Sequence, residues 1–169
     1  MHGGLPSFIL RARFDREIIA NVKDHEISDA IMRFVPSEIE RGGTVEPELL
    51  GLYGTVDWQS DSNNGSLNQY FARRRDPYGG LDRSLLYPAT LKGLELIGHA
   101  PAAKLFRESI STYSHFHPWV ENVREQLGIP KISSPDDSNV VSEYWDVEET
   151  LDQLRTAYVR KNIDQLAGR

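Results

Sequence analysis

Seven carboxylates lie between residues 132 and 154 of this sequence, with no basic residue among them. No lysine or arginine lies between Lys131 and Arg155, so this segment carries a charge of −7. Because the whole chain carries −6, the remaining residues sum to about +1. Spaced carboxylates can imitate the phosphates of DNA and attract a basic protein surface. The seven acids are Asp136, Asp137, Glu143, Asp146, Glu148, Glu149 and Asp152.

The same acids also fit an ordinary structural role. A solvated loop followed by an acidic first helical turn has this composition, because the helix dipole favours carboxylates at that end. A functional surface requires carboxylates that are exposed along one face and not paired with nearby arginines. Arg73, Arg74, Arg75 and Arg83 are the candidates for such pairing. The same arginines could instead contact phosphates or complement a helix dipole.

A second candidate site is the polar stretch that contains Asn63, Asn64, Gly65 and Gln69. Asparagine and glycine suit a tight turn and a helix cap, because both tolerate positive φ and an Asn side chain can accept from free N–H groups. Gln69 follows Asn64 by five residues and can bond back to the turn. The pattern predicts a structural turn lock or, alternatively, a surface for a partner or ligand.

A third candidate is the histidine pair His115 and His117. The two side chains share a face only in an extended chain, which Pro118 favours at His117. Two imidazoles could begin a metal site, but the spacing identifies no third ligand and the chain has no cysteine. The sequence also shows no nucleophile–base pair, phosphate loop or HExxH motif. We therefore expect two loop histidines, no metal, no cofactor and no enzymatic activity. A metal-binding or enzymatic domain is the alternative.

These side chains are expected to stand on a helical scaffold, because apolar residues recur at i, i+3 and i+4 along most of the chain. The pattern predicts an all-α fold, an irregular single-domain bundle of about six to eight helices covering residues 1–169. The predicted helices cover about residues 18–22, 25–35, 47–58, 66–75, 88–97, 101–113, 118–127 and 148–166.

Several breaks in this pattern carry separate predictions. Residues 60–65 and 129–142 are polar and are predicted to be loops. Residues 8–14 alternate, which indicates a short strand or an extended arm over residues 1–14. Gly51 and Gly54 either weaken the helix that contains them or mark a close helix crossing. Pro36 is expected to kink or end its helix, and Pro88 to open one.

Composition excludes several classes of protein. The chain has 169 residues, of which 39% are hydrophobic, so it can bury a core without disulfides. No apolar run approaches the ~20 residues of a membrane span, and the first residues do not resemble a signal peptide. The cytoplasm is the expected location. The net charge of −6 disfavours direct binding to nucleic acid or to an anionic membrane.

Three stretches stand out together: Tyr53 to Val56 followed by Asn63 to Phe71, then Leu91 to Gly98 with Ala102 to Leu105, and finally Tyr144 to Asn162. Their order and spacing resemble a bacterial family of small helical domains, the DNA-mimic-protein (DMP)-like family. The resemblance covers about residues 48–165. Departures from the family pattern are Ser66, where a second glycine is usual, the polar insert at residues 59–62, and His99, where a small residue is typical.

The resemblance implies an all-α fold without a cofactor, and a homodimer is one assembly that it suggests. The best-known member of the family mimics DNA. We therefore expect a non-enzymatic regulatory protein that binds a protein partner, such as a DNA-binding protein, through its acidic surface. The alternatives are a toxin-neutralising protein or another partner protein with a different target, and the domain built on His115 and His117.

Overall fold

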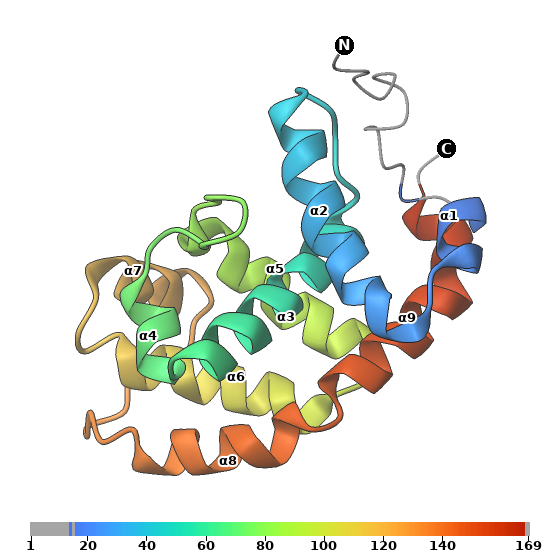
Figure 1. The fold of residues 1–169 in the computed structure, drawn as a ribbon. Helices are drawn as coiled ribbons and strands as arrows, with labels where there is room; N and C mark the ends of the chain where they lie inside the picture. Colours follow the sequence, from blue (N-terminus) through green and yellow to red (C-terminus); the bar gives the residue numbers. More distant parts are fainter. Residues whose placement is uncertain (1–13, 15, 168–169) are drawn as a thin grey trace.

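The computed structural model describes residue 14 and residues 16–167. This part of the chain forms nine α-helices, one 3-10 turn and no strand, which confirms the all-α prediction (Figure 1). The predicted arm falls on residues outside the described part, apart from Phe14, whose side chain is buried. The elements are α1 Arg16–Asn21, η1 Asp24–Glu26, α2 Ile27–Glu40, α3 Pro47–Asn64, α4 Leu67–Ala72, α5 Arg83–Leu96, α6 Ala100–Tyr113, α7 Pro118–Gln126, α8 Ser138–Glu148 and α9 Leu151–Leu166.

Helices α3 and α5 cross at the centre of the molecule with their backbones in contact (Figure 1). A methyl group added at Gly51 would come within 2.8 Å of the Ala89 carbonyl oxygen on α5. At Gly54 an added methyl would collide with the Thr90 side chain. Both glycines therefore permit a close crossing, because their missing Cβ atoms leave room for the opposite helix. The prediction that these two glycines mark a close helix crossing is thereby confirmed.

An aromatic core fills the space between α3, α4, α5 and α6. The Trp58 ring meets Phe106 edge to face, with 5.2 Å between ring centroids. Phe71 of α4 stacks on Tyr113 of α6 at 4.6 Å. Edge-to-face and offset arrangements are favoured by the ring quadrupole, so these rings add specific geometry to the apolar burial. The short helix α4 is anchored mainly by this cluster.

The loop predicted over residues 129–142 holds for residues 129–137, but helix α8, which was not predicted, replaces its last five residues. The helix begins at Ser138 and buries Val140, Tyr144 and Val147, which follow one another at i, i+4 and i+7. This apolar stripe packs against α6, so tertiary burial outweighs the weak helix propensity of the adjacent valines. With α1 and α8 included, the described residues hold nine α-helices, one more than the predicted range.

The predicted polar loop at residues 60–65 is also wrong, because α3 continues to Asn64. Asp61 and Ser62 are buried within this last turn, so their polar side chains face the protein and not water. Among the described residues, only glycines adopt positive φ, and Gly65 is not one of them. The tight turn expected at Asn63 and Asn64 is therefore replaced by the last turn of α3.

Two prolines lie inside helices, so Pro36 does not end its helix and Pro88 does not open one. Pro36 is within α2, which continues to Glu40, and Pro88 is within α5, which begins five residues earlier at Arg83. The Asp82 side chain accepts from the Ser84 N–H and so caps α5 at its true start. An interior proline removes one backbone hydrogen bond. The packing of α5 across α3 is extensive enough to retain the helix in spite of that loss.

Candidate functional site

Three of the seven predicted acids form a row on the exposed face of α8. Glu143, Asp146 and Glu149 follow one another at intervals of three residues, and all three are exposed. Glu149 is the C-cap residue and keeps helical φ and ψ. None of the three forms an ion pair with another described residue. We call these three side chains the acidic row.

The other four predicted acids are engaged in local structure. The Ser138 N–H and hydroxyl both bond Asp136, and these bonds lower the pKa of its carboxyl group. Asp137 accepts a 2.9 Å hydrogen bond from the Tyr113 hydroxyl. Glu148 and Asp152 also have partners, described below. The structure thus divides the acidic segment into a solvated row and four bonded carboxylates.

The predicted turn residue Asn63 contacts the acidic segment directly. Its Oδ1 accepts a 2.7 Å hydrogen bond from the Tyr144 hydroxyl, and its Nδ2 donates to Glu148 Oε1 at 2.8 Å. Gln59, one turn earlier on α3, also donates to Glu148 Oε1, at 3.0 Å. Two regions that the sequence presented as separate candidates therefore meet, because the end of α3 holds the buried side of α8.

The remaining residues of the predicted turn bond elsewhere. Gln69 Nε2 donates to Asp61 Oδ1 at 2.9 Å, so Gln69 does reach back, but to the last turn of α3 and not to a loop. The cap of α4 is Ser66, whose hydroxyl accepts from the Gln69 N–H. Asn64 Nδ2 lies 3.3 Å from the Tyr78 hydroxyl. Gly65 packs against the Gln69 side chain.

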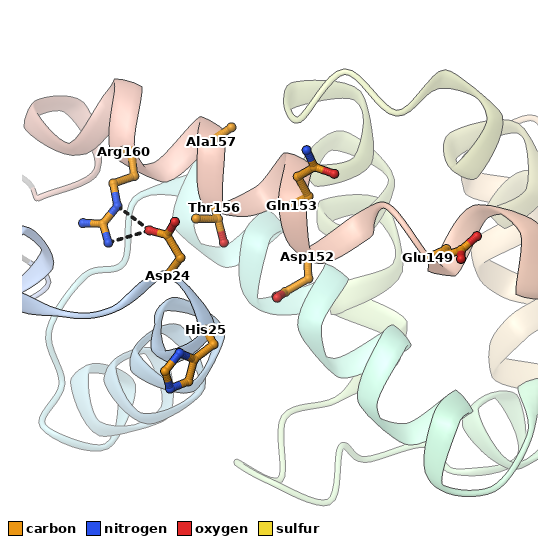
Figure 2. A pocket seen from close by; sticks show the side chains of 8 residues that line it. All are labelled: Asp24, His25, Glu149, Asp152, Gln153, Thr156, Ala157 and Arg160. Atoms are coloured by element: carbon orange, nitrogen blue, oxygen red, sulfur yellow. Dashed lines mark hydrogen bonds and ion pairs between the residues drawn. The ribbon is translucent and has the colours of Figure 1, made fainter.

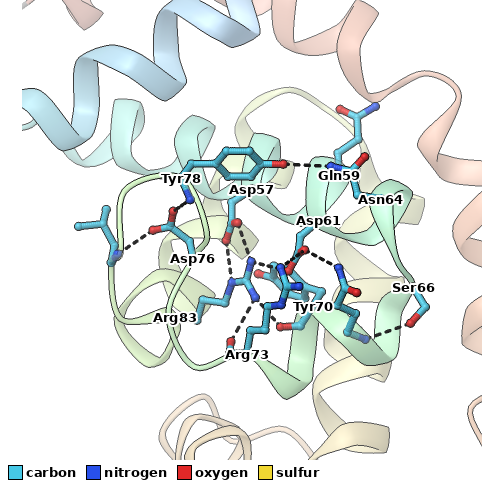
Figure 3. A network of polar contacts seen from close by, with 12 residues as sticks. Asp57, Gln59, Asp61, Asn64, Ser66, Tyr70, Arg73, Asp76, Tyr78 and Arg83 are labelled. Carbon is cyan, nitrogen blue, oxygen red and sulfur yellow. Dashed lines mark hydrogen bonds and ion pairs between the residues drawn. The ribbon is translucent and has the colours of Figure 1, made fainter.

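A buried ion-pair network lies beneath this turn (Figure 3). The Arg83 guanidinium is fully buried and donates to both oxygens of Asp57, at 2.9 and 2.7 Å, and to Asp61 at 2.9 Å. It also lies 4.2 Å from the Tyr70 ring centroid. Burial raises the pKa of Asp57 to about 6, because loss of solvation outweighs the hydrogen bonds from Arg83. The sequence analysis does not predict this network, because Asp57 falls within a predicted helix, Asp61 within a predicted loop, and their common partner Arg83 lies on another helix.

The arginine cluster does not neutralise the acidic row. Arg73 pairs with Asp61 at 3.1 Å and Arg74 with Asp82 at 3.4 Å. Arg75 donates to the Gly80 carbonyl at 2.9 Å. These partners lie around α3 and the start of α5, whereas the acidic row lies on α8. The condition set out for a functional acidic surface, that its carboxylates be free of these arginines, holds for the row.

A family model described as DMP19-like protein matches residues 44–162 of the chain. The match spans more than half of the sequence. The chain belongs to the DMP19-like family. Searches of curated proteins and of solved structures find no match. The region shared with the DMP19-like family begins just before α3 and ends within α9, so it includes the acidic row, Asn63 and the buried Arg83 network.

A groove of about 600 Å³ continues from the acidic row along α9 (Figure 2). Glu149 and Asp152 contribute carboxylates to it, and η1 contributes Asp24 and His25 from outside the DMP19-like match. Arg160 pairs with Asp24 at 2.8 Å within the groove. This pair leaves the α8 end of the groove as its more acidic part.

Asp152 is held from two sides. It accepts from the Ser28 hydroxyl at 2.7 Å and pairs with the fully buried Arg155 at 3.2 Å. Arg155 also donates to Thr55 and Gln59 of α3, which ties α9 to the central helix. Burial lowers the pKa of Arg155 to about 10. Asp152 therefore serves the fold as well as the surface.

The two predicted loop histidines have different surroundings. His115 Nε2 lies 2.7 Å from the Ile132 carbonyl oxygen, and the His117 ring stacks on Trp119 with centroids 4.8 Å apart. Burial lowers the pKa of His117. No cluster of three metal-ligating side chains occurs in residues 16–167 or at residue 14. The expectation that His115 and His117 bind no metal remains a prediction.

No described helix is both long enough and apolar enough to cross a membrane.

Proposed function

We propose that this member of the DMP19-like family is a non-enzymatic regulatory protein that binds a basic, DNA-binding protein through the acidic row. The observation that carries the proposal is the exposure of Glu143, Asp146 and Glu149 without a cationic partner among the described residues. The resemblance to a family with a DNA-mimicking member supports the same interpretation. The protein is expected to act in the cytoplasm, without a cofactor and without binding nucleic acid itself.

The spacing of the acidic row supports mimicry of a phosphate backbone. An α-helix rises about 1.5 Å per residue, so neighbouring carboxylates of the row are separated by about 4.5 Å along the axis. A DNA strand carries one phosphate per about 3.4 Å of helix axis. The two densities are comparable. A basic groove that accepts DNA would therefore meet a similar field at α8.

The distribution of charge supports a directional field. The segment between residues 132 and 154 carries −7, while the rest of the chain sums to about +1. Charges of one sign gathered on one side of a protein steer an oppositely charged partner during encounter. Such steering weakens as salt rises, since the screening length is about 8 Å at physiological ionic strength. Binding to the partner should therefore be strongly salt-dependent.

The test is a comparison of two variants with equal charge loss. The first carries Glu143→Gln, Asp146→Asn and Glu149→Gln in the acidic row. The control carries Glu40→Gln, Glu46→Gln and Glu125→Gln, three exposed acids on other helices and loops. Parent and variants would be used to capture proteins from a lysate of the native host. Captured proteins would be identified by mass spectrometry, with duplex DNA added as competitor.

The expected result is a DNA-binding protein that the parent and the control capture and the row variant does not. Added duplex DNA should release it, because both ligands would occupy the same basic groove. The association rate should fall in the row variant more than the dissociation rate rises. Equal capture by the row variant and the parent would contradict the proposal, as would a partner that duplex DNA does not displace.

A further inference from the structure

One large aromatic side chain stands among the acids of α8. Trp145 is 54% exposed, although most tryptophan side chains are largely buried. Tyr78 and Phe116 are the other aromatic side chains of the described residues that are comparably exposed. Trp145 is separated from Glu149 by one helical turn and from Glu148 by three residues, so both are its neighbours on the helix surface.

We propose that Trp145 is the anchor of the acidic surface and receives an arginine side chain of the basic partner. The inference deepens the proposed function and rests on it, because it names the chemistry that the same surface recognises. A guanidinium group can stack on an indole face while its N–H groups donate to a carboxylate. Trp145 and Glu149, at i and i+4, supply both elements on one side of α8.

The indole is supported by a continuous chain of rings from the core. Trp58 meets Phe106 at 5.2 Å and Tyr144 at 5.3 Å, and Tyr144 meets Trp145 at 5.2 Å, all edge to face. Tyr144 is in turn fixed by its hydrogen bond to Asn63. Trp145 is the exposed end of this chain. An aromatic side chain held in this way loses little conformational freedom on binding, which favours its use as an anchor.

One of the neighbouring carboxylates is held in place as well. Glu148 accepts hydrogen bonds from Gln59 and Asn63 through a single oxygen, Oε1. Its second oxygen, Oε2, has no hydrogen-bond partner among the described residues. The surface around Trp145 thus combines a positioned ring, a positioned carboxylate and the solvated carboxylate of Glu149.

Charge complementarity favours a basic partner over a second copy of this chain. Tryptophan on an exposed helix face can also mark a self-association surface. Two copies that met through α8, however, would bring two acidic rows together, and like charges juxtaposed at an interface oppose association. An arginine-bearing partner buries the same ring and neutralises the carboxylates at once.

The test uses two synthetic peptides, nona-arginine and nona-lysine, whose binding to the full chain is measured by fluorescence anisotropy of a labelled peptide. Trp145→Leu removes the π face but retains apolar area, and Trp145→Phe restores an aromatic ring. Phe116→Leu is the matched control, because Phe116 is exposed to 55% on a different segment. The row variant with three amides separates the charge contribution from that of the ring.

Trp145→Leu is expected to weaken nona-arginine binding about two- to fivefold and nona-lysine binding less. Trp145→Phe should recover most of the loss, and Phe116→Leu should bind like the parent. The row variant should bind both peptides at least about threefold more weakly. Sedimentation velocity of each unbound variant should match that of the parent.

The possible failures are distinguishable. If Trp145→Leu binds both peptides like the parent while the row variant does not, the anchor role is wrong and the proposed function stands. If Trp145→Leu weakens both peptides equally, the preference for arginine is wrong. A lower oligomeric state of Trp145→Leu alone would assign the ring to self-association and overturn the inference. If the row variant binds like the parent, the proposed function fails and the anchor role fails with it.

Discussion

The molecule contains two groups of carboxylates with opposite surroundings. Asp57 and Asp61 on α3 are buried and share the buried guanidinium of Arg83. Glu143, Asp146 and Glu149 on α8 face solvent, and no described lysine, arginine or histidine pairs with them. The charges of the first group are paired inside the protein. The second group leaves its charge directed outward, where a partner can meet it.

This difference shows that local acidity in a sequence does not by itself locate a functional charge. Asp57 and Asp61 stand on one helix face four residues apart, a spacing at which like charges repel each other. Their role is decided by Arg83, which lies on another helix, and by the burial of all three side chains. Buried ion pairs stabilise only when each charge is compensated. We therefore expect substitutions in the buried group to change the free energy of unfolding strongly, and substitutions in the acidic row to change it little.

The largest effect is expected for Arg83→Met. This change leaves Asp57 buried without a cation and Asp61 with Arg73 as its one remaining cationic partner among the described residues. Breaking a buried pair typically costs about 3–5 kcal/mol of unfolding free energy. Urea unfolding followed by circular dichroism would measure the loss. Arg107→Met is the control, because Arg107 is exposed and its pair with Glu95 is long, at 3.5 Å. Equal stability of the two variants would show that the buried network contributes little.

The free energy of unfolding is expected to depend on pH through Asp57. Its pKa is raised from 3.8 to about 6 in the folded protein, so folding favours the protonated acid. The stability that this shift contributes is fully present below about pH 3.8 and is lost as pH rises through about 6. The unfolding free energy of the parent, relative to Asp57→Asn, should therefore fall between pH 4 and 7, by at most about 3 kcal/mol. A difference independent of pH would contradict the raised pKa.

An intermediate effect on stability is expected for Asn63→Ala, which removes two of the hydrogen bonds between α3 and α8. The change leaves the Tyr144 hydroxyl with only its longer bond to the Gln59 carbonyl, at 3.2 Å, and removes one donor from Glu148. We expect a loss of about 1–2 kcal/mol. Amide hydrogen exchange should increase most in α8. Asn68→Ala, an exposed position on α4, is the control. Uniform exchange across the chain would argue against a local tether.

The fold class followed from the sequence because most helices bury a stripe with the ordinary period, and glycines and prolines mark several of their ends. The predictions that failed concern segments whose secondary structure depends on tertiary contacts. Helix α8 has its stripe at Val140, Tyr144 and Val147, but the loop predicted over residues 129–142 covered its first five residues, including the two adjacent valines. The last turn of α3 is polar because it lines a buried network, a fact that requires knowing where Arg83 lies. Asn63 and the acidic segment were both singled out, but only the folded chain brings them together.

The smallest effect on stability is expected for the row variant, Glu143→Gln with Asp146→Asn and Glu149→Gln. Exposed charges that lack partners contribute little to folding, and removing three like charges from one helix relieves some repulsion. The unfolding free energy should therefore change by no more than about 0.5 kcal/mol. This result matters for the comparison, because the same variant is expected to lose its partner. Loss of binding without loss of stability would assign the row to recognition, whereas a loss of stability comparable to that of Arg83→Met would mean that both groups of carboxylates serve the fold.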